Sequence, residues 1–360
     1  MNAILTRRTV ELCRIASVTG NEADCAERIA AILRDTPLAV SRVGNTILAR
    51  TVARAGRPLV LLVGHTDTVP PKATDGGVRI EGDRLYGLGA SDMKGGLAVM
   101  LELSRAVGDG RDLNVDLGFV FYDKEEGPWA ESGLGPTLEQ TPWLRRAELA
   151  FCLEPSDNVV QVGCLGTLHA TVAFGGKAAH SARPWQGANA IHAAAPLLAA
   201  LAARAPNDVV CDGHLFREVL SATLASGGNT RNVIPDRFSL NLNYRFAPGR
   251  SDESAMEEVR RFCAESCPLN PPDVSFVEVA PSGRVVLENR LLRRFLAENG
   301  NAVAAKQAWT DVARLSQAGI DAVNLGPGLA AQAHQADEYC SIDLLEASYR
   351  QFARFVGLSG

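Results

Sequence analysis

The chain has 360 residues, of which 46% are apolar and 21% charged, and its formal net charge is −5. This composition is that of an ordinary soluble protein with one or two domains, and its weakly acidic balance gives no reason to expect nucleic acid or an anionic membrane as a partner. No run of about 18 apolar residues exists, so the sequence predicts no membrane span.

Arginines and acids interrupt the apolar patch in residues 1–20, which predicts a helix and no signal peptide. The eight cysteines are scattered and form no Cys-x-x-Cys pair. Cys263 and Cys267 stand four apart in a predicted helix, where two packed thiols are a better interpretation than a metal pair. Reduced thiols are typical of cytosolic enzymes, so we expect a cytoplasmic protein.

The first part of the chain alternates between strand and helix patterns. An amphipathic helix is predicted over 22–36, with Asn21 as its cap candidate, and another over 91–107. Short apolar runs at 45–51, 57–63, 115–122 and 148–152 have the length of strands. Continuous apolar runs are typical of central strands covered on both faces, so the sequence predicts an α/β layered domain.

From about residue 167 the pattern changes. Strands are predicted at 168–176, 218–228, 237–248 and 274–281, with helices at 187–205 and 251–265 between them. The order β-α-β-β-α-β predicts a two-layer sandwich with its own sheet. After about 280 the first pattern resumes, with helices near 288–299, 311–318 and 345–356. We therefore expect a discontinuous catalytic domain, 1–166 and 281–360, interrupted by an inserted domain, 167–280.

Polar residues follow the predicted strands of the first domain. His65 and Asp67 follow the run at 57–63, Asp123 to Glu126 follow 115–122, and Glu154 follows 148–152. His334 follows the strand-like 321–326 after a short loop. Ligands of open α/β sheets bind outside the carboxyl ends of the strands. Each signal alone is weak, since a lone histidine or a Glu-Glu pair is usually an ordinary polar residue or surface turn, but together they favour one shared site.

The residue types in this set are His, Asp and Glu without cysteine, which suits zinc, cobalt or manganese in a reactive site. Asp92, just before a predicted helix, is a fifth candidate ligand. The segment GLGASD at 87–92 lacks the third glycine of a dinucleotide fingerprint, and neither G-x-S-x-G nor a P-loop is present. Metal-assisted chemistry is therefore the leading hypothesis.

Seven segments in this order resemble the di-zinc metallopeptidase-like amidohydrolases: GHTDTVP (64–70), GLGASDMKGG (87–96), DKEEG (123–127), LEPSD (153–157), GGKAAHSARPWQGANAIH (175–192), GNTRNVIPD (228–236) and His334 after GPG (326–328). The family includes aminoacylases, glutamate carboxypeptidases, acetylornithine deacetylase and succinyl-diaminopimelate desuccinylase. Within it, the stretches 163–169, 180–192, 232–236, 243–251 and 309–315 most resemble the actinobacterial type of succinyl-diaminopimelate desuccinylase.

The resemblance implies two divalent metal ions per subunit, most often zinc, with cobalt or manganese as alternatives. It implies His65, Asp92 and Glu154 as ligands of one metal, and Asp92, Glu126 and His334 as ligands of the other. Asp67 would orient His65, and Glu125 would be the general base. In the inserted domain, His180 matches a histidine that reaches the neighbouring subunit's active site in the family's homodimers.

Asn232 and Arg245 match positions of the inserted domain that contact the substrate. The chain departs from better-known desuccinylases at Cys164-Leu165, where they carry basic residues, so Arg183, Arg231 or Arg245 would replace that carboxylate contact. The resemblance implies a small, carboxylate-rich N-acyl amino acid as substrate, N-succinyl-diaminopimelate first of all. The alternatives are an acetylornithine deacetylase, a carboxypeptidase, or an inactive relative that serves as a scaffold.

Overall fold

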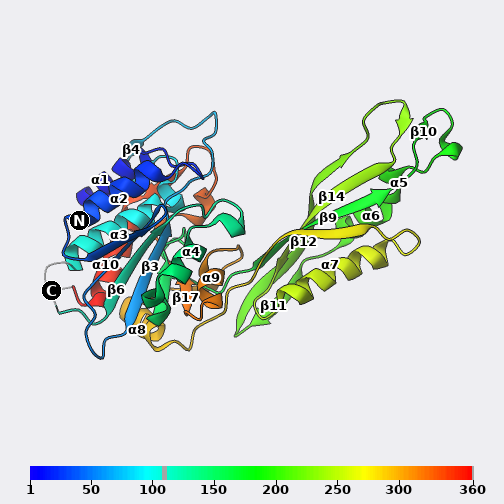
Figure 1. The fold of residues 1–360 in the computed structure, drawn as a ribbon. Coiled ribbons are helices and arrows are strands. Elements are labelled where there is room, and N and C mark those ends of the chain that lie inside the picture. Colours follow the sequence, from blue (N-terminus) through cyan, green and yellow to red (C-terminus); the bar gives the residue numbers. More distant parts are fainter. Residues whose placement is uncertain (108–111, 359–360) are drawn as a thin grey trace. The chain divides into compact units, whose positions relative to one another are not determined.

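The computed structural model describes residues 1–107 and 112–358 (Figure 1). The chain folds into two compact units. The first consists of Met1–Gly163, Arg284–Ala305 and Arg314–Gly360, and the second of Cys164–Gly283 and Lys306–Ala313. Within the described ranges, every helix is too short or too polar to cross a membrane.

The first unit is built on one mixed sheet of eight strands. Its order is β1 (Ala39–Val43), β2 (Thr46–Arg50), β6 (Asp116–Tyr122), β3 (Leu59–His65), β7 (Ala147–Cys152), β17 (Ala322–Asn324), β8 (Val160–Val162) and β16 (Val303–Ala305). The central strands β6, β3, β7 and β17 run parallel to one another. All seven residues of β6 are buried, as expected for a strand that is covered on both faces.

Helices cover this sheet. They are α1 (Asn2–Cys13), α2 (Ala23–Arg34), α3 (Gly95–Val107), α4 (Leu134–Gln140), α8 (Arg290–Asn299), α9 (Val312–Gln317), which starts at the boundary between the units, and α10 (Ile342–Val356). The helices α1, α3 and α10 pack against one another (Figure 1). An aromatic cluster of Phe151, Phe295, Phe352 and Phe355, with ring centroids 4.9–6.0 Å apart, holds α8 and α10 against β7.

Two helix ends show how local chemistry sets these elements. The hydroxyl of Ser341 accepts the N–H of Leu344 and caps α10, which ends at Gly357 with φ 88°. The prediction that Asn21 caps α2 was wrong. The N-cap position is one residue later, at Glu22, whose carboxylate accepts the N–H of Gly20 at 2.6 Å instead of an N–H of the first turn.

A small three-stranded sheet lies beside the helical layer of the first unit. Its order is β18 (Tyr339–Ser341), β5 (Arg84–Tyr86) and β4 (Arg79–Glu81). The antiparallel pairing of β18 with β5 places the segment around residue 338 next to the loop that follows residue 86. This pairing brings together two segments that are some 250 residues apart in the chain, at Tyr86 and Tyr339.

The second unit is an antiparallel sheet with helices on one face. The sheet order is β11 (Asn207–Cys211), β12 (His214–Gly227), β14 (Arg237–Phe246), β9 (Gly166–Gly175) and β15 (Asp273–Ala280). The helices are α5 (Ala190–Ala193), α6 (Ala195–Ala203) and α7 (Asp252–Ser266), and a short ribbon pairs β10 (Ala179–His180) with β13 (Val233–Ile234). Burial alternates along β14 as a strand with one covered face requires.

The predicted fold class, a mixed-sheet α/β domain with an inserted two-layer β-α-β-β-α-β sandwich, is confirmed. Two details differ. The helix expected over 187–205 is broken at Ala194, because Pro196 starts a new helix and lacks the N–H that would continue the old one. The strand β11, which pairs with the start of β12, was not predicted.

Candidate metal centre

The carboxyl ends of three parallel strands position the first part of the site. The strand β3 ends at His65, β6 ends just before the acidic segment 123–126, and β7 ends two residues before Glu154. Because β6 and β7 both run parallel to β3, these residues emerge at one edge of the sheet. His65 and Glu154 are buried there, and Glu126 is half-buried.

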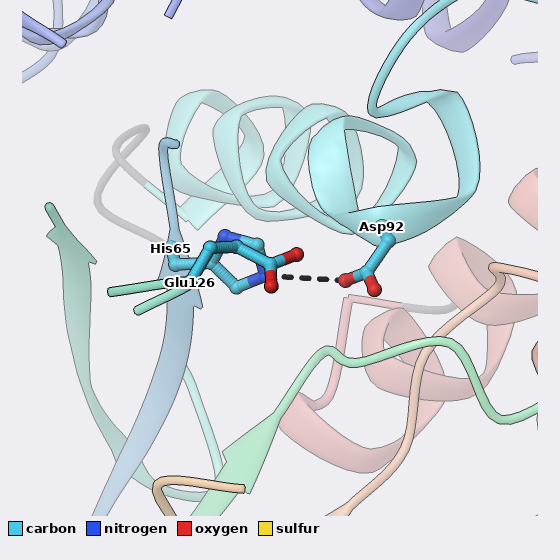
Figure 2. A group of neighbouring side chains, drawn as sticks. All are labelled: His65, Asp92 and Glu126. Atoms are coloured by element: carbon cyan, nitrogen blue, oxygen red, sulfur yellow. Dashed lines mark hydrogen bonds and ion pairs between the residues drawn. The ribbon is translucent and has the colours of Figure 1, made fainter. Parts of the chain in front are cut away.

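Asp92 lies between two groups of side chains. Its Oδ1 is 3.2 Å from Nε2 of His65, and that nitrogen is 4.0 Å from Oε1 of Glu154. Its Oδ2 is 3.7 Å from Nε2 of His334, which is 2.8 Å from Oε1 of Glu126. Ligand atoms of His65, Asp92 and Glu126 lie within 4.8 Å of one another, and Figure 2 shows these three side chains converging.

The acidic surroundings act strongly on the two histidines. Burial lowers the pKa of His65, but its hydrogen bonds to Asp67 and Asp92 outweigh burial and raise this pKa well above the usual value. The hydrogen bond to Glu126 likewise raises the pKa of His334. Both shifts show a concentration of negative charge that favours a cation. Nitrogen and oxygen donors without sulfur fit zinc, cobalt or manganese, so the residues present suit the metal that the sequence pattern predicts.

Asp67 is wholly buried and braces the acidic loop. Its carboxylate accepts the backbone N–H groups of Glu125 and Glu126, each at 3.0 Å, and the hydroxyl of Thr19 at 3.0 Å. Its Oδ1 is also 3.4 Å from Nδ1 of His65, whose ring nitrogen lies 3.1 Å from the carbonyl oxygen of Asp67. One carboxylate therefore fixes both the ring of His65 and the backbone of the acid pair.

The turn after β6 explains how two neighbouring acids can serve one site. Lys124 adopts a left-handed conformation with φ 60°, so the chain turns between Asp123 and the acid pair. Asp123 is buried and accepts the hydroxyl of Thr46 at 3.3 Å, while its carbonyl oxygen accepts the N–H of Gly133. Asp123 thus anchors the loop, which leaves Glu125 and Glu126 to face the centre.

The loop that carries Asp92 is held by a residue that the sequence patterns did not indicate. The carboxylate of Glu338, which is 4% exposed, accepts the N–H groups of Gly89, Ser91 and Asp92 at 2.7, 2.7 and 2.8 Å. Burial raises the pKa of this carboxyl to about 7, against the effect of these donors. The signal available was a pair of adjacent acids, Asp337 and Glu338, three and four residues after His334 and directly before β18.

The remaining predicted residues lie in the second unit. His180, Arg183 and Asn232 are exposed and adjoin one another, because the carbonyl oxygen of His180 accepts the N–H of Arg183 and that of Asn232 accepts the N–H of Ser181. Arg245 lies apart from them on the face of β14 opposite the buried side chains, and its Nε donates to Oδ1 of Asn243 at 3.0 Å.

Comparison with known proteins agrees with this geometry. The model of the peptidase family M20/M25/M40 matches residues 61–357. A Mycobacterium tuberculosis protein, provisionally named succinyl-diaminopimelate desuccinylase, is 38% identical over 97% of both chains. A succinyl-diaminopimelate desuccinylase of Corynebacterium glutamicum is 37% identical over 94% of this chain and 92% of its own.

Solved structures share the fold over nearly the whole chain. A tripeptidase of Staphylococcus aureus superposes with a TM-score of 0.82, covering 99% of this chain and 98% of its own at 21% identity. A dinuclear metal-binding M20 peptidase of Bacillus subtilis gives a TM-score of 0.76 at 15% identity, covering 98% and 97%. Identities this low establish the fold alone.

Proposed function

Since this chain belongs to peptidase family M20/M25/M40, we propose that it hydrolyses the amide of N-succinyl-LL-2,6-diaminopimelate to succinate and LL-2,6-diaminopimelate with two divalent metal ions. One observation carries the two-metal proposal. The two carboxylate oxygens of Asp92 face different histidines, each of which has a glutamate of its own, Glu154 or Glu126. A carboxylate placed in this way suits a bridge between two cations.

His65, Asp92 and Glu154 would hold one metal, and Asp92, Glu126 and His334 the other. Bound metals of this kind polarise a carbonyl group and lower the pKa of a water molecule towards about 7. Zinc is the first candidate, and cobalt and manganese are the alternatives.

Glu125 is the residue that moves the proton in this proposal. It takes a proton from the attacking water and gives it to the amine that leaves when the amide C–N bond breaks. Its backbone N–H donates to Asp67, which fixes the main chain of Glu125 next to Glu126. A general base in such a position contributes roughly 10²–10⁴ in rate.

The substrate assignment rests on the two desuccinylase relatives and on charge. N-succinyl-diaminopimelate carries several carboxylates, and guanidinium groups bind carboxylates in a bidentate way. Arg183 and Arg245 of the second unit are the arginines we propose for this contact, with Asn232 as a further polar contact. Burial lowers the pKa of the Arg245 guanidinium, although the charge of Glu278 acts in the opposite direction. A carboxylate ligand would relieve that cost.

A direct comparison of substrates tests this proposal. The zinc-loaded protein should hydrolyse N-succinyl-diaminopimelate with a kcat/KM at least about tenfold above that for N-acetylornithine, since a pocket that pairs a substrate carboxylate disfavours an analogue without it. A preference for N-acetylornithine would make the protein a deacetylase. A failure to bind zinc, cobalt or manganese, with no hydrolysis, would favour a scaffold role.

We also propose a homodimer formed through the second unit, in which His180 stabilises the oxyanion of the neighbouring active site. Mixing an inactive Glu125→Gln protein with an inactive His180→Ala protein should then restore part of the activity through mixed dimers. Analytical ultracentrifugation shows whether the dimer forms, and exchange of labelled subunits shows whether mixed dimers are present. Mixed dimers without any recovered activity would contradict supply of His180 from the partner.

The cellular setting that we propose is the cytoplasm. No disulfide joins any of the eight cysteines in the described structure, and burial raises the pKa of seven of them, including Cys13 and Cys263 to about 12. Thiols with a raised pKa are slow to react, as suits packed side chains in a reducing compartment.

A further inference from the structure

Glu338 ties together the two segments that carry Asp92 and His334. It stands four residues after His334 and directly before β18. Its side chain accepts three N–H groups of the segment 89–92, and its carbonyl oxygen accepts the N–H of Gly87 at 2.9 Å. Both the backbone and the side chain of one buried residue therefore hold the loop that presents Asp92.

The loop cannot satisfy these N–H groups by itself. Gly89 is left-handed with φ 77°, and Asp92 has a non-helical conformation with φ −119° and ψ 89°, so the helical hydrogen-bond pattern is interrupted here. Buried N–H groups without an acceptor are costly, and the carboxylate of Glu338 supplies the acceptor for three of them. One of the three donors is the N–H of Asp92 itself.

We propose that Glu338 is a positioning residue that presets the Asp92 carboxylate between the two metal positions, before any metal binds. This inference rests on the two-metal function proposed above. Glu338 does not reach the metals in this scheme. It acts through the backbone of Asp92, and because it shares a segment with His334, it sets the spacing between the shared carboxylate and a ligand of the second metal.

Glu338 would accept the same N–H groups if it only stabilised the fold. A test must therefore separate stabilisation of the fold from positioning of Asp92 for metal. The loop has a second attachment, because the hydroxyl of Ser91 donates to the carbonyl oxygen of Leu329 at 3.2 Å and accepts the N–H of Leu329 at 2.6 Å. This attachment is independent of Glu338. Removal of the carboxylate should therefore loosen Asp92 and leave the loop attached to the unit.

The test is Glu338→Gln, whose amide keeps one acceptor and turns the other into a donor. Asp337→Asn is the matched control, because it is the same chemical change one residue earlier. Asp337 is 44% exposed and pairs with Arg79 at 2.8 Å, and its left-handed φ of 58° suits asparagine. Metal binding is followed by the cobalt absorption spectrum and by zinc content after gel filtration.

We expect Glu338→Gln to bind cobalt about 10–100-fold more weakly than the unmodified protein, with an altered cobalt spectrum, and Asp337→Asn to bind it normally. Excess metal should restore part of the turnover of the glutamine variant. Equal affinity and an equal spectrum in Glu338→Gln and the unmodified protein would overturn the inference. An unmodified protein that binds no second metal would instead overturn the two-metal function, so the two failures are distinguishable.

Hydrogen exchange of the unmodified protein keeps the inference testable even if the variant does not fold. In metal-free protein, a peptide covering 87–93 should exchange its amide hydrogens slowly, because Glu338 holds three of them without metal. Rapid exchange that becomes slow only on addition of zinc would show that the metal, and not Glu338, orders the loop, and would refute the inference.

Discussion

Replacing Asp67 with asparagine keeps the shape of a wholly buried side chain and removes its negative charge. The two carboxylate oxygens of Asp67 accept the N–H groups of Glu125 and Glu126 and the hydroxyl of Thr19, each at 3.0 Å. Asparagine offers one oxygen and one amino group in these places. At least one N–H of the acid pair must then face another donor, so the backbone of the pair has to move.

The size of the effect follows from these contacts. A hydrogen bond to a buried charged group contributes about 1.5–3 kcal/mol, and an N–H left without an acceptor costs about 1–3 kcal/mol. These costs overlap, so we expect Asp67→Asn to lower the free energy of unfolding by roughly 2–4 kcal/mol. At about 2–4 °C per kcal/mol for a unit of this size, Tm should fall by roughly 4–16 °C.

Catalysis should suffer separately from stability. A displacement of about 1 Å in a group beside the reacting atoms can reduce the rate about 10²-fold, and Glu125 takes its position from Asp67. We therefore expect kcat/KM for N-succinyl-diaminopimelate to fall about 10²-fold at saturating zinc, measured well below the Tm of the variant. Weaker zinc binding, by about 10–100-fold, should accompany this loss, because Asp67 also orients His65.

Asp116→Asn is the control for this experiment. Asp116 is 6% exposed and accepts the N–H of Arg54 at 3.0 Å, but it is the first residue of β6, at the end of the strand away from the centre. The same substitution there should lower Tm and leave kcat/KM within about threefold, as expected for a distant site. An Asp67→Asn protein with normal kcat/KM and normal Tm would refute the bracing role.

Three further predictions concern other residues. Glu125→Gln should keep its zinc content, measured by elemental analysis, and lose at least about 10² in kcat; near-normal turnover would contradict its role as base. Glu218→Gln should lower the Tm of the second unit at pH 7, because the N–H of Ala247 and the guanidinium of Arg250 outweigh burial and lower the pKa of Glu218. A carboxyl with a lowered pKa contributes its full stability only above the unfolded pKa of about 4.3, so the loss of Tm, measured by calorimetry, should vanish as the pH falls through the folded pKa. The control Asp208→Asn, at an exposed residue, should change Tm little. Gly133→Ala should cost about 1–3 kcal/mol in chemical denaturation, because the added methyl group would lie 2.0 Å from the Asp123 carboxylate; unchanged stability would show that this loop can yield.

The sequence was sufficient to locate those site residues that directly follow a predicted strand. Continuous apolar runs predicted β3, β6 and β7, and their parallel pairing puts His65, Glu126 and Glu154 at one edge of the sheet. Asp92 and His334 were less certain, because both lie in irregular segments, one before a predicted helix and the other beyond a short loop. Their residue types and neighbouring elements made them weak candidates, and resemblance to a known family assigned them to particular metals. The structure brings both into contact with the others.

Other features depend on contacts that a sequence pattern does not display. The partners of Glu338 are backbone N–H groups 246 to 249 positions away, and backbone groups leave no trace in residue type. Nothing in the residue pattern of 306–313 indicates that this segment packs with the second unit, where Gln307 bonds to the carbonyl oxygen of Leu215. The acids 125 and 126 were visible, but the turn at Lys124 that directs them was not.

The centre is therefore built by two kinds of carboxylate with different partners. Asp92, Glu126 and Glu154 face the histidines. Asp67 and Glu338 instead accept five backbone N–H groups of the loops that carry acids of the first kind, and Asp67 also contacts the ring of His65. Loops outside a sheet have no ladder to satisfy such N–H groups, so a buried acid can fix them where a strand cannot reach. The same arrangement gathers negative charge that protons or cations must offset, which is why the pKa values of His65 and His334 are raised. The acids that hold the loops therefore have two effects. They fix the positions of the ligand side chains, and they add to the negative charge that a bound metal neutralises.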